Sequence, residues 1–422
     1  MINILVILFT LIGLNRILFS NQGIRESLVW VVYGLILGYR TIQISSNLSF
    51  HPIEIFVYSA ILRIILFKTF NYSSFPISYK LLTINFILFI FVDLVDSNNL
   101  YALNEFKNAF LLPLILFLSN HINIDREYIT KIFRHYSIAV SVIAFLGIVE
   151  FLFPEIMANI FGFSEIVRPR IDSIFFSRLA FLYWGTHLAA NLIPPFFPIT
   201  LFLYIKNESI VSSKIAITFL IIINLFAIYL SGNRISWLFL TIFIVFTIIF
   251  LYEKLVYHIK TYIVLLSLSF IIYIYSQPVE GRYISTFKAI AGKIDDRYDS
   301  SGAQRLMFVQ IALEKIKDNP IGVGWGYKFW VHSDLIQISL KTGIVSGILF
   351  IYILLNLLKK NLIKYYMYNE DNIYFCFSCL MIFVILSLGI NGNISLVQCG
   401  TPMFLFISLI ESYYLNKKAF KN

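Results

Sequence analysis

The sequence predicts an all-α, polytopic integral membrane protein with about 12–14 transmembrane helices. Of its 422 residues, 59% are hydrophobic and only 13% are charged, whereas soluble domains carry about 25% charged residues. The apolar residues also lie in uncharged blocks, such as 237–251 and 262–276, which approach the length that crosses a hydrocarbon layer. Because a backbone inside lipid must satisfy its own hydrogen bonds, we expect these blocks to be helices.

We interpret residues 1–422 as one membrane domain that spans the bilayer repeatedly. The first apolar block lacks a basic start and contains Arg16, so we expect a retained helix rather than a signal peptide. Cys376 and Cys379 lie inside an apolar run, and we expect two buried thiols there rather than a redox or metal site. The expected spans are 3–19, 28–44, 53–67, 81–95, 106–120, 137–153, 181–204, 215–230, 236–252, 261–276, 335–357, 372–390 and 398–415.

The short connections between these spans differ in charge on the two sides of the membrane. Connections 96–105 and 391–397 contain no Lys or Arg, whereas 13 basic residues, mostly Lys, lie in the alternate set, which is 121–136, 205–214, 253–260, 358–371 and the C-terminal tail. The positive-inside rule assigns the basic set to the cytoplasm, together with the C-terminus. An odd number of spans would put the N-terminus outside, and one early interfacial segment would put it inside.

Three segments on the predicted outer face run against this charge bias, namely 154–180, 231–235 and the large loop 277–334. Arginine on the translocated side needs a reason, and binding an anion is one. The alternative is that these arginines pair with acidic residues of the same loops. The outer arginines are Arg168, Arg170, Arg178, Arg234, Arg282, Arg297 and Arg305.

Arg234 lies in a polar junction between two expected spans, Ser231-Gly232-Asn233-Arg234. Two spans follow, so Arg234 and the loop 277–334 must share a face. A charge flanked by apolar runs is costly unless it is paired or faces a wet cavity, which makes Arg234 a candidate functional residue. The alternative is an arginine that snorkels to anchor a helix end.

The outer loop contains one predicted amphipathic helix, near 302–318. Ser301 and Gln304 fit the N-cap and N3 positions of a capping box, and Asn319-Pro320 ends the helix. We expect it to lie on the membrane surface or over a cavity. Arg305 falls in its predicted first turn, where free N–H groups and the helix dipole favour an anion. The predicted apolar face is Leu306, Val309, Leu313 and Ile316.

The helix is followed by the glycine-rich run 322–326 and then by His332 at the start of the next span. No strand precedes the glycines and no Lys-Ser/Thr follows them, so we expect tight turns rather than a nucleotide site. A lone His at a helix end is usually structural, but this one follows an arginine-bearing helix. No His, Cys or Asp group has metal-ligand spacing, so no metal and no cofactor are predicted; for Asp295, Asp296 and Asp299 salt bridges are expected.

These motifs, in this order and with two spans after the first, resemble the O-antigen ligase and O-antigen polymerase superfamily over about residues 215–350. The chain departs from the family pattern at Asn233, where a second Ser is commoner, and at Lys341, where an acidic residue is frequent. The matching segments are Ser231-Gly232-Asn233-Arg234, Gly302-Ala303-Gln304-Arg305, Asn319-Pro320-Ile321-Gly322-Val323-Gly324, Val331-His332-Ser333-Asp334-Leu335 and Lys341-Thr342-Gly343-Ile344.

The resemblance implies a metal-independent glycosyltransferase. Such enzymes act on undecaprenyl-diphosphate-linked glycans at the outer, periplasmic or extracellular, face of the cytoplasmic membrane. By resemblance, Arg234 and Arg305 hold the donor diphosphate and have catalytic roles, Arg170 is a further substrate-binding arginine, and His332 activates or positions the acceptor hydroxyl. The implied partners are the lipid-linked oligosaccharide, the bilayer and a chain-length regulator protein, with no nucleic acid.

Three functions are weighed on this basis. A polysaccharide polymerase, for O-antigen, capsule or exopolysaccharide repeats, is favoured because relatives of this length with an Asn-Pro-x-Gly-x-Gly run are often polymerases. The first alternative is an O-antigen ligase, which moves the glycan to lipid A-core. The alternative of another class is a flippase for the lipid-linked oligosaccharide, which predicts paired repeats and broken helices near the midplane. No internal repeat is visible in the sequence, and the charge lies in outer loops, with Asp93 as the main exception.

Overall fold

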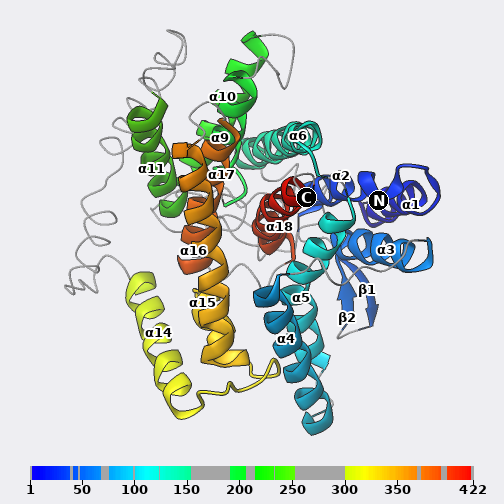
Figure 1. Ribbon diagram of the computed structural model, residues 1–422, viewed down its shortest axis with the longest axis vertical. Helices are drawn as coiled ribbons and strands as arrows, with labels where there is room; N and C mark the ends of the chain where they lie inside the picture. Colours follow the sequence, from blue (N-terminus) through cyan, green and yellow to red (C-terminus); the bar gives the residue numbers. More distant parts are fainter. Residues whose placement is uncertain are drawn as a thin grey trace.

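The computed structural model is almost entirely helical (Figure 1). In the described part of the chain there are fourteen α-helices, one 3-10 helix and one two-stranded antiparallel sheet. The all-α prediction is therefore confirmed, with a single small hairpin as the exception. The described residues are 2–38, 41–45, 48–67, 76–97, 100–122, 124–153, 191–205, 214–231, 233–251, 300–367, 372–390 and 397–419.

The described elements fall into two groups along the chain, before and after residues 154–190. The first group is α1 (Ile2–Phe19), α2 (Gly23–Gly34), η1 (Leu35–Leu37), β1 (Ile42–Ser45), β2 (Leu48–Phe50), α3 (Pro52–Phe67), α4 (Ile77–Ser97), α5 (Leu100–His121) and α6 (Arg126–Leu152). The second group is α9 (Phe196–Ile205), α10 (Lys214–Ser231), α11 (Arg234–Leu251), α14 (Ser300–Asp318), α15 (Asp334–Thr342), α16 (Ile344–Met367), α17 (Asn372–Ile390) and α18 (Val397–Ala419).

Several described helices have the length and apolarity of membrane spans. Four meet both criteria: Ala102–His121, Arg126–Glu150, Ile344–Met367 and Asn372–Ile390. Five shorter helices are also apolar: Ile4–Phe19, Ile77–Phe91, Phe196–Ile205, Ile217–Ser231 and Ile235–Leu251. A polytopic membrane protein is thus confirmed. The expected span 261–276 lies outside the described residues, and the total of about 12–14 spans stays a prediction.

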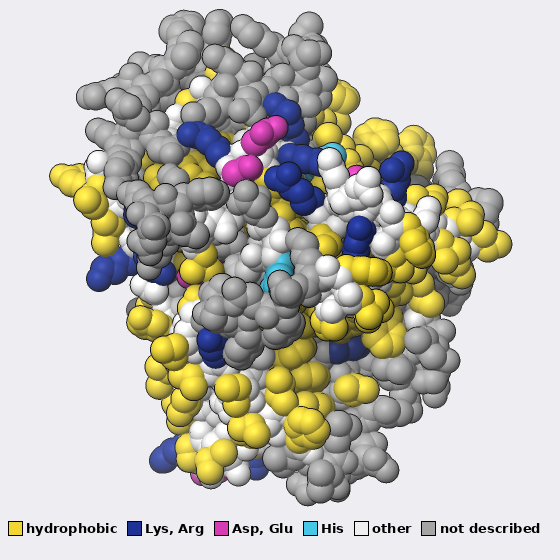
Figure 2. All heavy atoms as spheres, turned by 45° about the vertical axis from the view of Figure 1, so that its right-hand side comes forward, with side chains coloured by type: hydrophobic (Ala, Val, Ile, Leu, Met, Phe, Trp, Pro, Cys, Tyr) yellow, Lys and Arg dark blue, Asp and Glu magenta, His cyan; other side chains and the backbone are white. Residues whose placement is uncertain are grey.

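Large hydrophobic side chains cover much of the surface (Figure 2). In α1 and α3, for example, Leu11 and Leu66 are 54% and 63% exposed. Soluble proteins rarely expose wide apolar patches, whereas a lipid-facing surface is apolar by necessity. Lys and Arg side chains gather mainly toward the top of this view, interspersed with acidic ones.

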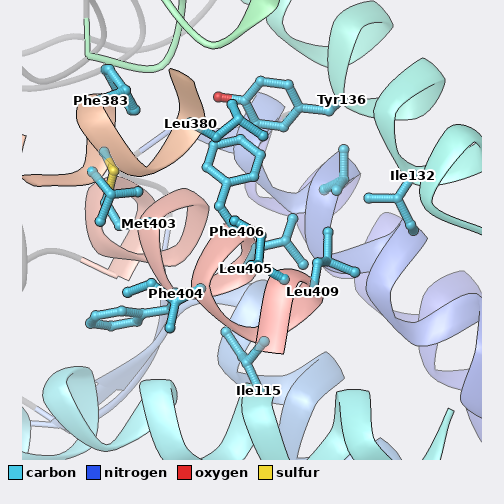
Figure 3. Packing of buried hydrophobic residues seen from close by; sticks show 14 of the residues in the cluster. Ile115, Ile132, Tyr136, Leu380, Phe383, Met403, Phe404, Leu405, Phe406 and Leu409 are labelled. Atoms are coloured by element: carbon cyan, nitrogen blue, oxygen red, sulfur yellow. The ribbon is translucent and has the colours of Figure 1, made fainter. Parts of the chain in front are cut away.

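The helix α18 lies at the centre of the bundle. Its residues from Met403 to Ile410 are all buried, and it packs mainly against α5. Figure 3 shows Phe406 and Leu409 of α18 between Ile115 of α5 and Tyr136 of α6. α18 also buries the polar side chains of Thr401, Glu411 and Ser412, which would be costly against lipid, so it needs protein neighbours on those sides.

Three predicted spans are wrong in part. In the expected span 28–44, the helix ends near Gly38, which has φ +62°, and Ile42–Ser45 form a strand. Glycine reaches this conformation without a Cβ penalty, and the β-branched residues that follow favour a strand. In the expected span 181–204, residues 191–195 form turns before α9, because consecutive prolines at 194 and 195 remove backbone donors.

The third correction concerns the expected span 335–357, which is two helices. α15 ends at Thr342 and α16 begins at Ile344, with Gly343 between them at φ +89°. Asn85 of α4 contacts this break from the side, donating hydrogen bonds to the carbonyl of Thr342 and to the hydroxyl of Ser346. The hydropathy of the segment is continuous, so periodicity alone predicted one helix.

Hydrogen bonds and ion pairs join the helix ends into two groups that agree with the predicted faces. At one end, Arg25 pairs with Asp125 at 3.9 Å and Asn416 donates to the carbonyl of Ile124 at 3.2 Å. Residues 124 and 125 belong to a predicted cytoplasmic connection. At the other end, Lys107 of α5 pairs with Glu54 of α3 at 2.9 Å and lies 4.7 Å from the ring of Phe50, which docks the hairpin.

Candidate functional site

The junction between α10 and α11 is an N-cap centred on Asn233. Its side-chain oxygen accepts hydrogen bonds from the backbone N–H of Ile235 at 2.9 Å and of Ser236 at 3.1 Å. Its amide nitrogen donates to the Asn191 side chain at 3.3 Å. Asn is among the best N-cap residues, so the departure from Ser at this position keeps the cap. Arg234 is consequently the first residue of α11.

We expect Asn233→Ala to lower the free energy of unfolding by about 0.5–2 kcal/mol, because the first turn of α11 loses its acceptor. Asn233→Ser should keep most of the stability, since a serine hydroxyl caps equally well. Thermal unfolding of the two purified variants in one detergent measures the difference. Equal melting temperatures for the two variants would show that the cap contributes nothing.

The predicted amphipathic helix is confirmed as α14, with a corrected start. α14 begins at Ser300, so Ser301 lies inside the helix rather than at its N-cap, and Arg305 falls in the second turn rather than the first. It ends at Asp318, and Asn319 donates its backbone N–H to the Lys315 carbonyl at 2.9 Å. Asn319-Pro320 thus terminates the helix as predicted.

The packed face of α14 agrees with the predicted apolar face only in part, at Val309 and Ile316. Ala312 and Ile316 are buried, whereas Leu306 and Leu313 are 41% and 53% exposed. The buried pair forms a small core with Val331 and Leu340, which belong to the following segment and to α15. The two exposed leucines lie on a flank of α14 that protein does not cover, as the lipid-surface alternative requires.

Arg305 belongs to this packed face. At helical spacing it shares a side with Phe308 and Ala312, which lie three and seven residues further on. Phe308 packs edge-to-face on Phe329, with ring centroids 5.7 Å apart. Arg305 itself is half-buried. The Arg305 side chain is therefore attached to the face of α14 that packs against the segment leading to His332.

The glycine-rich run lies directly against the α15–α16 break. The backbone N–H of Val323 donates to the Leu340 carbonyl at 2.9 Å, and that of Gly324 donates to the Lys341 carbonyl at 3.0 Å. Gly322, at φ +115°, approaches so closely that an added Cβ would lie 2.6 Å from the backbone nitrogen of Gly343. Tight turns were predicted here, and the structure confirms them.

Asp93 near the C-terminal end of α4 holds the next part of this run. Its carboxylate accepts hydrogen bonds from the backbone N–H groups of Trp325 and, at 3.2 Å, of Gly326. An added Cβ on Gly324 would lie 2.3 Å from the same carboxylate. Backbone N–H bonds to a carboxylate are charge-assisted and strong. Asp93 is thus an anchor for the turn rather than merely a helix-end residue.

Lys341 is buried near the C-terminal end of α15. Its ammonium group lies 2.9 Å from the carboxylate of Glu105 on α5 and donates to the Trp325 carbonyl at 3.3 Å. The lysine side chain is 1% exposed and that of Glu105 is 14% exposed. An unpaired charge at this depth would be costly, so the Glu105 carboxylate is what makes a lysine tolerable here.

His332 follows a segment that Gln337 of α15 fixes. The Gln337 side chain accepts from the backbone N–H of Val331 at 2.9 Å and donates to the Phe329 carbonyl at 3.0 Å. His332 is half-buried, with its ring centroid 4.1 Å from that of Trp330. The backbone that leads to His332 is therefore held at residues 329 and 331, which restricts the position of the imidazole.

The predicted site residues have the following places in the structure. Arg305 and His332 belong to one packed unit formed by α14, the connection 319–333 and α15; Figure 1 shows this connection passing below α15 toward α4. Arg234 is placed through the backbone of α11, and Arg170 lies outside the described residues. Convergence of all four on one cavity stays a prediction.

The sequence reading did not assign roles to Glu105 and Gln337, and it left Asp93 as a helix-end residue. A signal for the two acids was present, because each lies near an end of an apolar helix flanking the short connection 96–105.

No three His, Cys, Asp or Glu side chains meet as metal ligands among the described residues. Cys376 and Cys379 are free and buried, as predicted.

Comparison with known proteins identifies one family. The model of the O-antigen ligase family matches residues 219–351, a segment that runs from α10 to the first turns of α16. The resemblance to the O-antigen ligase and polymerase superfamily is therefore confirmed over this segment. Asp93 and Glu105 lie outside it. No curated protein sequence matches the chain.

Proposed function

We propose that this protein is a polysaccharide polymerase. It transfers a glycan from undecaprenyl diphosphate to another lipid-linked repeat unit at the outer face of the cytoplasmic membrane. The observation that carries the proposal is the packing of the Arg305-bearing face of α14 onto the segment that ends at His332. A cation and a proton acceptor are thereby built into one unit within the family-matched segment.

The proposed reaction uses no group beyond these side chains. The acceptor hydroxyl oxygen attacks C1 of the donor sugar, and the bond between C1 and the diphosphate oxygen breaks, with the electron pair leaving on the diphosphate. Arg234, Arg305 and Arg170 stabilise the negative charge that develops there. The hydroxyl proton passes to the imidazole of His332, which acts as the general base.

The outer face is proposed from the agreement of two arguments. The distribution of Lys and Arg places residues 121–136 in the cytoplasm. The structure puts Asp93, Glu105 and the 319–333 connection together, at the ends of α4 and α5 remote from that basic connection. The lipid-linked donor then enters the site from the bilayer, and the glycan chain grows on the outer side of the membrane.

A ligase is the second candidate, because the matched family is described as O-antigen ligase. It differs from a polymerase in its acceptor, which would be lipid A-core rather than a second lipid-linked repeat. A flippase is less well supported, since the described cations and acids of the site lie at helix ends, whereas a transporter site lies near the midplane.

The test is chain growth by the purified protein in liposomes that contain lipid-linked repeat units extracted from the producing cell. Elongation without lipid A-core supports the polymerase; transfer only after lipid A-core is added would establish the ligase. Lipid translocation without any transfer would establish the flippase.

In the same liposomes His332→Ala is expected to lower elongation by about 10²–10⁴-fold, because the proton acceptor is lost. His121→Ala is the matched control. This histidine lies at the C-terminal end of α5, away from the end that carries Glu105, and its ring bonds the Phe117 carbonyl at 2.9 Å. Elongation by His332→Ala at the wild-type rate would remove His332 from the proposed mechanism.

A further inference from the structure

We infer that Asp93, Glu105 and Lys341 form a clamp on the Trp325 peptide that positions His332 for the proposed transfer. The inference rests on the proposed function for its catalytic consequence, and on geometry alone for the clamp. Asp93 and Glu105 come from α4 and α5, outside the family-matched segment. The clamp therefore extends the site into the N-terminal half of the chain.

The clamp binds both the backbone N–H and the backbone carbonyl of one residue. Asp93 accepts the backbone N–H of Trp325, and Lys341 donates to its carbonyl at 3.3 Å. The indole is fixed as well: its N–H donates to the Phe86 carbonyl at 3.3 Å, and its ring meets that of Phe86 edge-to-face with centroids 5.3 Å apart. Trp325 is 2% exposed, so its place is determined in every direction.

The charges of the clamp depend on one another. Lys341 is 1% exposed and would be an uncompensated buried cation without Glu105, which lies 2.9 Å away. The pair thus keeps opposite charges together at this point while leaving the ammonium group free to hold the Trp325 carbonyl.

One face of α15 links the clamp to His332. Gln337 and Lys341 are one helical turn apart and lie on the same side of α15. Lys341 holds residue 325, and Gln337 holds residues 329 and 331. The segment between the glycine turn and His332 is therefore fixed at both ends by one short helix. A shift of the Trp325 end would change where the imidazole lies.

Small displacements of this kind have large effects on catalysis, because a misplacement of about 1 Å costs on the order of 10²-fold in rate. Glu105→Gln and Lys341→Met are each expected to lower the turnover number of elongation by about 10²-fold, with the KM for the lipid-linked donor changed less than about threefold, since neither residue is proposed to bind the donor. The charge-reversed double variant, Glu105→Lys with Lys341→Glu, restores an ion pair but should not recover the loss, because a carboxylate at position 341 cannot donate to the Trp325 carbonyl.

A second buried ion pair on α5 provides the matched control. Lys107 and Glu54 lie 2.9 Å apart, with side chains 10% and 1% exposed, but they hold the hairpin instead of the Trp325 segment. Lys107→Met should lower the melting temperature while leaving turnover per folded protein within about threefold of wild type. Equal losses of turnover from Lys107→Met and Lys341→Met would overturn positioning as the role of the clamp.

Amide hydrogen exchange separates failure of the clamp from failure of the proposed function. The backbone N–H groups of residues 323–326 all donate within the described contacts, so a peptide covering them should exchange faster in Glu105→Gln and Asp93→Asn than in wild type. Unchanged exchange together with unchanged turnover in these variants would refute the clamp. Faster exchange in a protein whose wild type elongates no chain would uphold the clamp and refute the polymerase.

Discussion

Arg305→Ala is expected to lower glycan transfer by about 10²–10³-fold in the liposome assay while leaving the protein folded. The guanidinium is proposed to stabilise the charge that develops on the leaving diphosphate, and removing one such donor typically costs this much. The side chain is only half-buried at the second turn of α14, whereas the buried residues of that face are Ala312 and Ile316. The packing of α14 should therefore survive the substitution.

Arg305→Lys is the informative companion, because it keeps the charge and removes the planar fork that bonds two phosphate oxygens at once. We expect intermediate activity from it. Lys317→Ala is the matched control, since Lys317 lies in the last turn of the same helix and is exposed. Loss of the folded protein in Arg305→Ala, or loss of activity in Lys317→Ala to the same degree, would contradict a role for Arg305 at the diphosphate.

The elements that the sequence predicted well are those with local signals. The apolar blocks that became α3, α10 and α17 have the expected boundaries to within one residue, because a uniformly apolar run bounded by polar residues leaves little choice in a bilayer. α14 was equally accessible, since a polar N-terminal turn and Asn319-Pro320 bracket it. Arg234 and His332 became candidates because charge and polarity beside apolar runs are conspicuous, and their roles stay a prediction.

The parts that could not be predicted depend on contacts between distant segments. Lys341 and Glu105 are far apart in the sequence, as are Trp325 and Asp93, and nothing local indicates that they pair. Because the sequence does not indicate the pairing with Glu105, Lys341 appeared only as a departure from the family pattern. The packed face of α14 was predicted only in part for a similar reason: its several apolar residues leave more than one possible face, and contacts with the 319–333 connection and α15 select the face that carries Ala312.

The division between α15 and α16 was also hidden, because Lys341 is the only charged residue in the run 335–357 and Gly343 within it could have belonged to a continuous helix. What breaks the helix is the approach of another backbone. The backbone N–H of Ile344 donates to the Pro320 carbonyl at 3.0 Å, and Gly322 crosses beside Gly343. Two glycines from separate motifs are thus required by one crossing, where side chains would keep the backbones apart.

Gly343→Ala is accordingly expected to destabilise the protein by more than about 3 kcal/mol, because two costs add. The residue has φ +89°, a conformation that costs a residue with a side chain about 1–3 kcal/mol. The added Cβ would also lie 2.2 Å from the carbonyl oxygen of Ile321, a backbone atom that cannot move aside without displacing the 319–326 turn. Thermal unfolding and size-exclusion chromatography in detergent measure the effect.

Gly389→Ala in α17 is the matched control for this prediction, because an added Cβ there meets nothing within 4 Å. Alanine stabilises a helix interior relative to glycine by about 0.5–1 kcal/mol, so its melting temperature should equal or exceed that of wild type. A Gly343→Ala protein as stable as Gly389→Ala would show that the 319–326 turn does not cross the helix break. That result would also contradict the proposed positioning of His332, since the same crossing joins the glycine turn to α15.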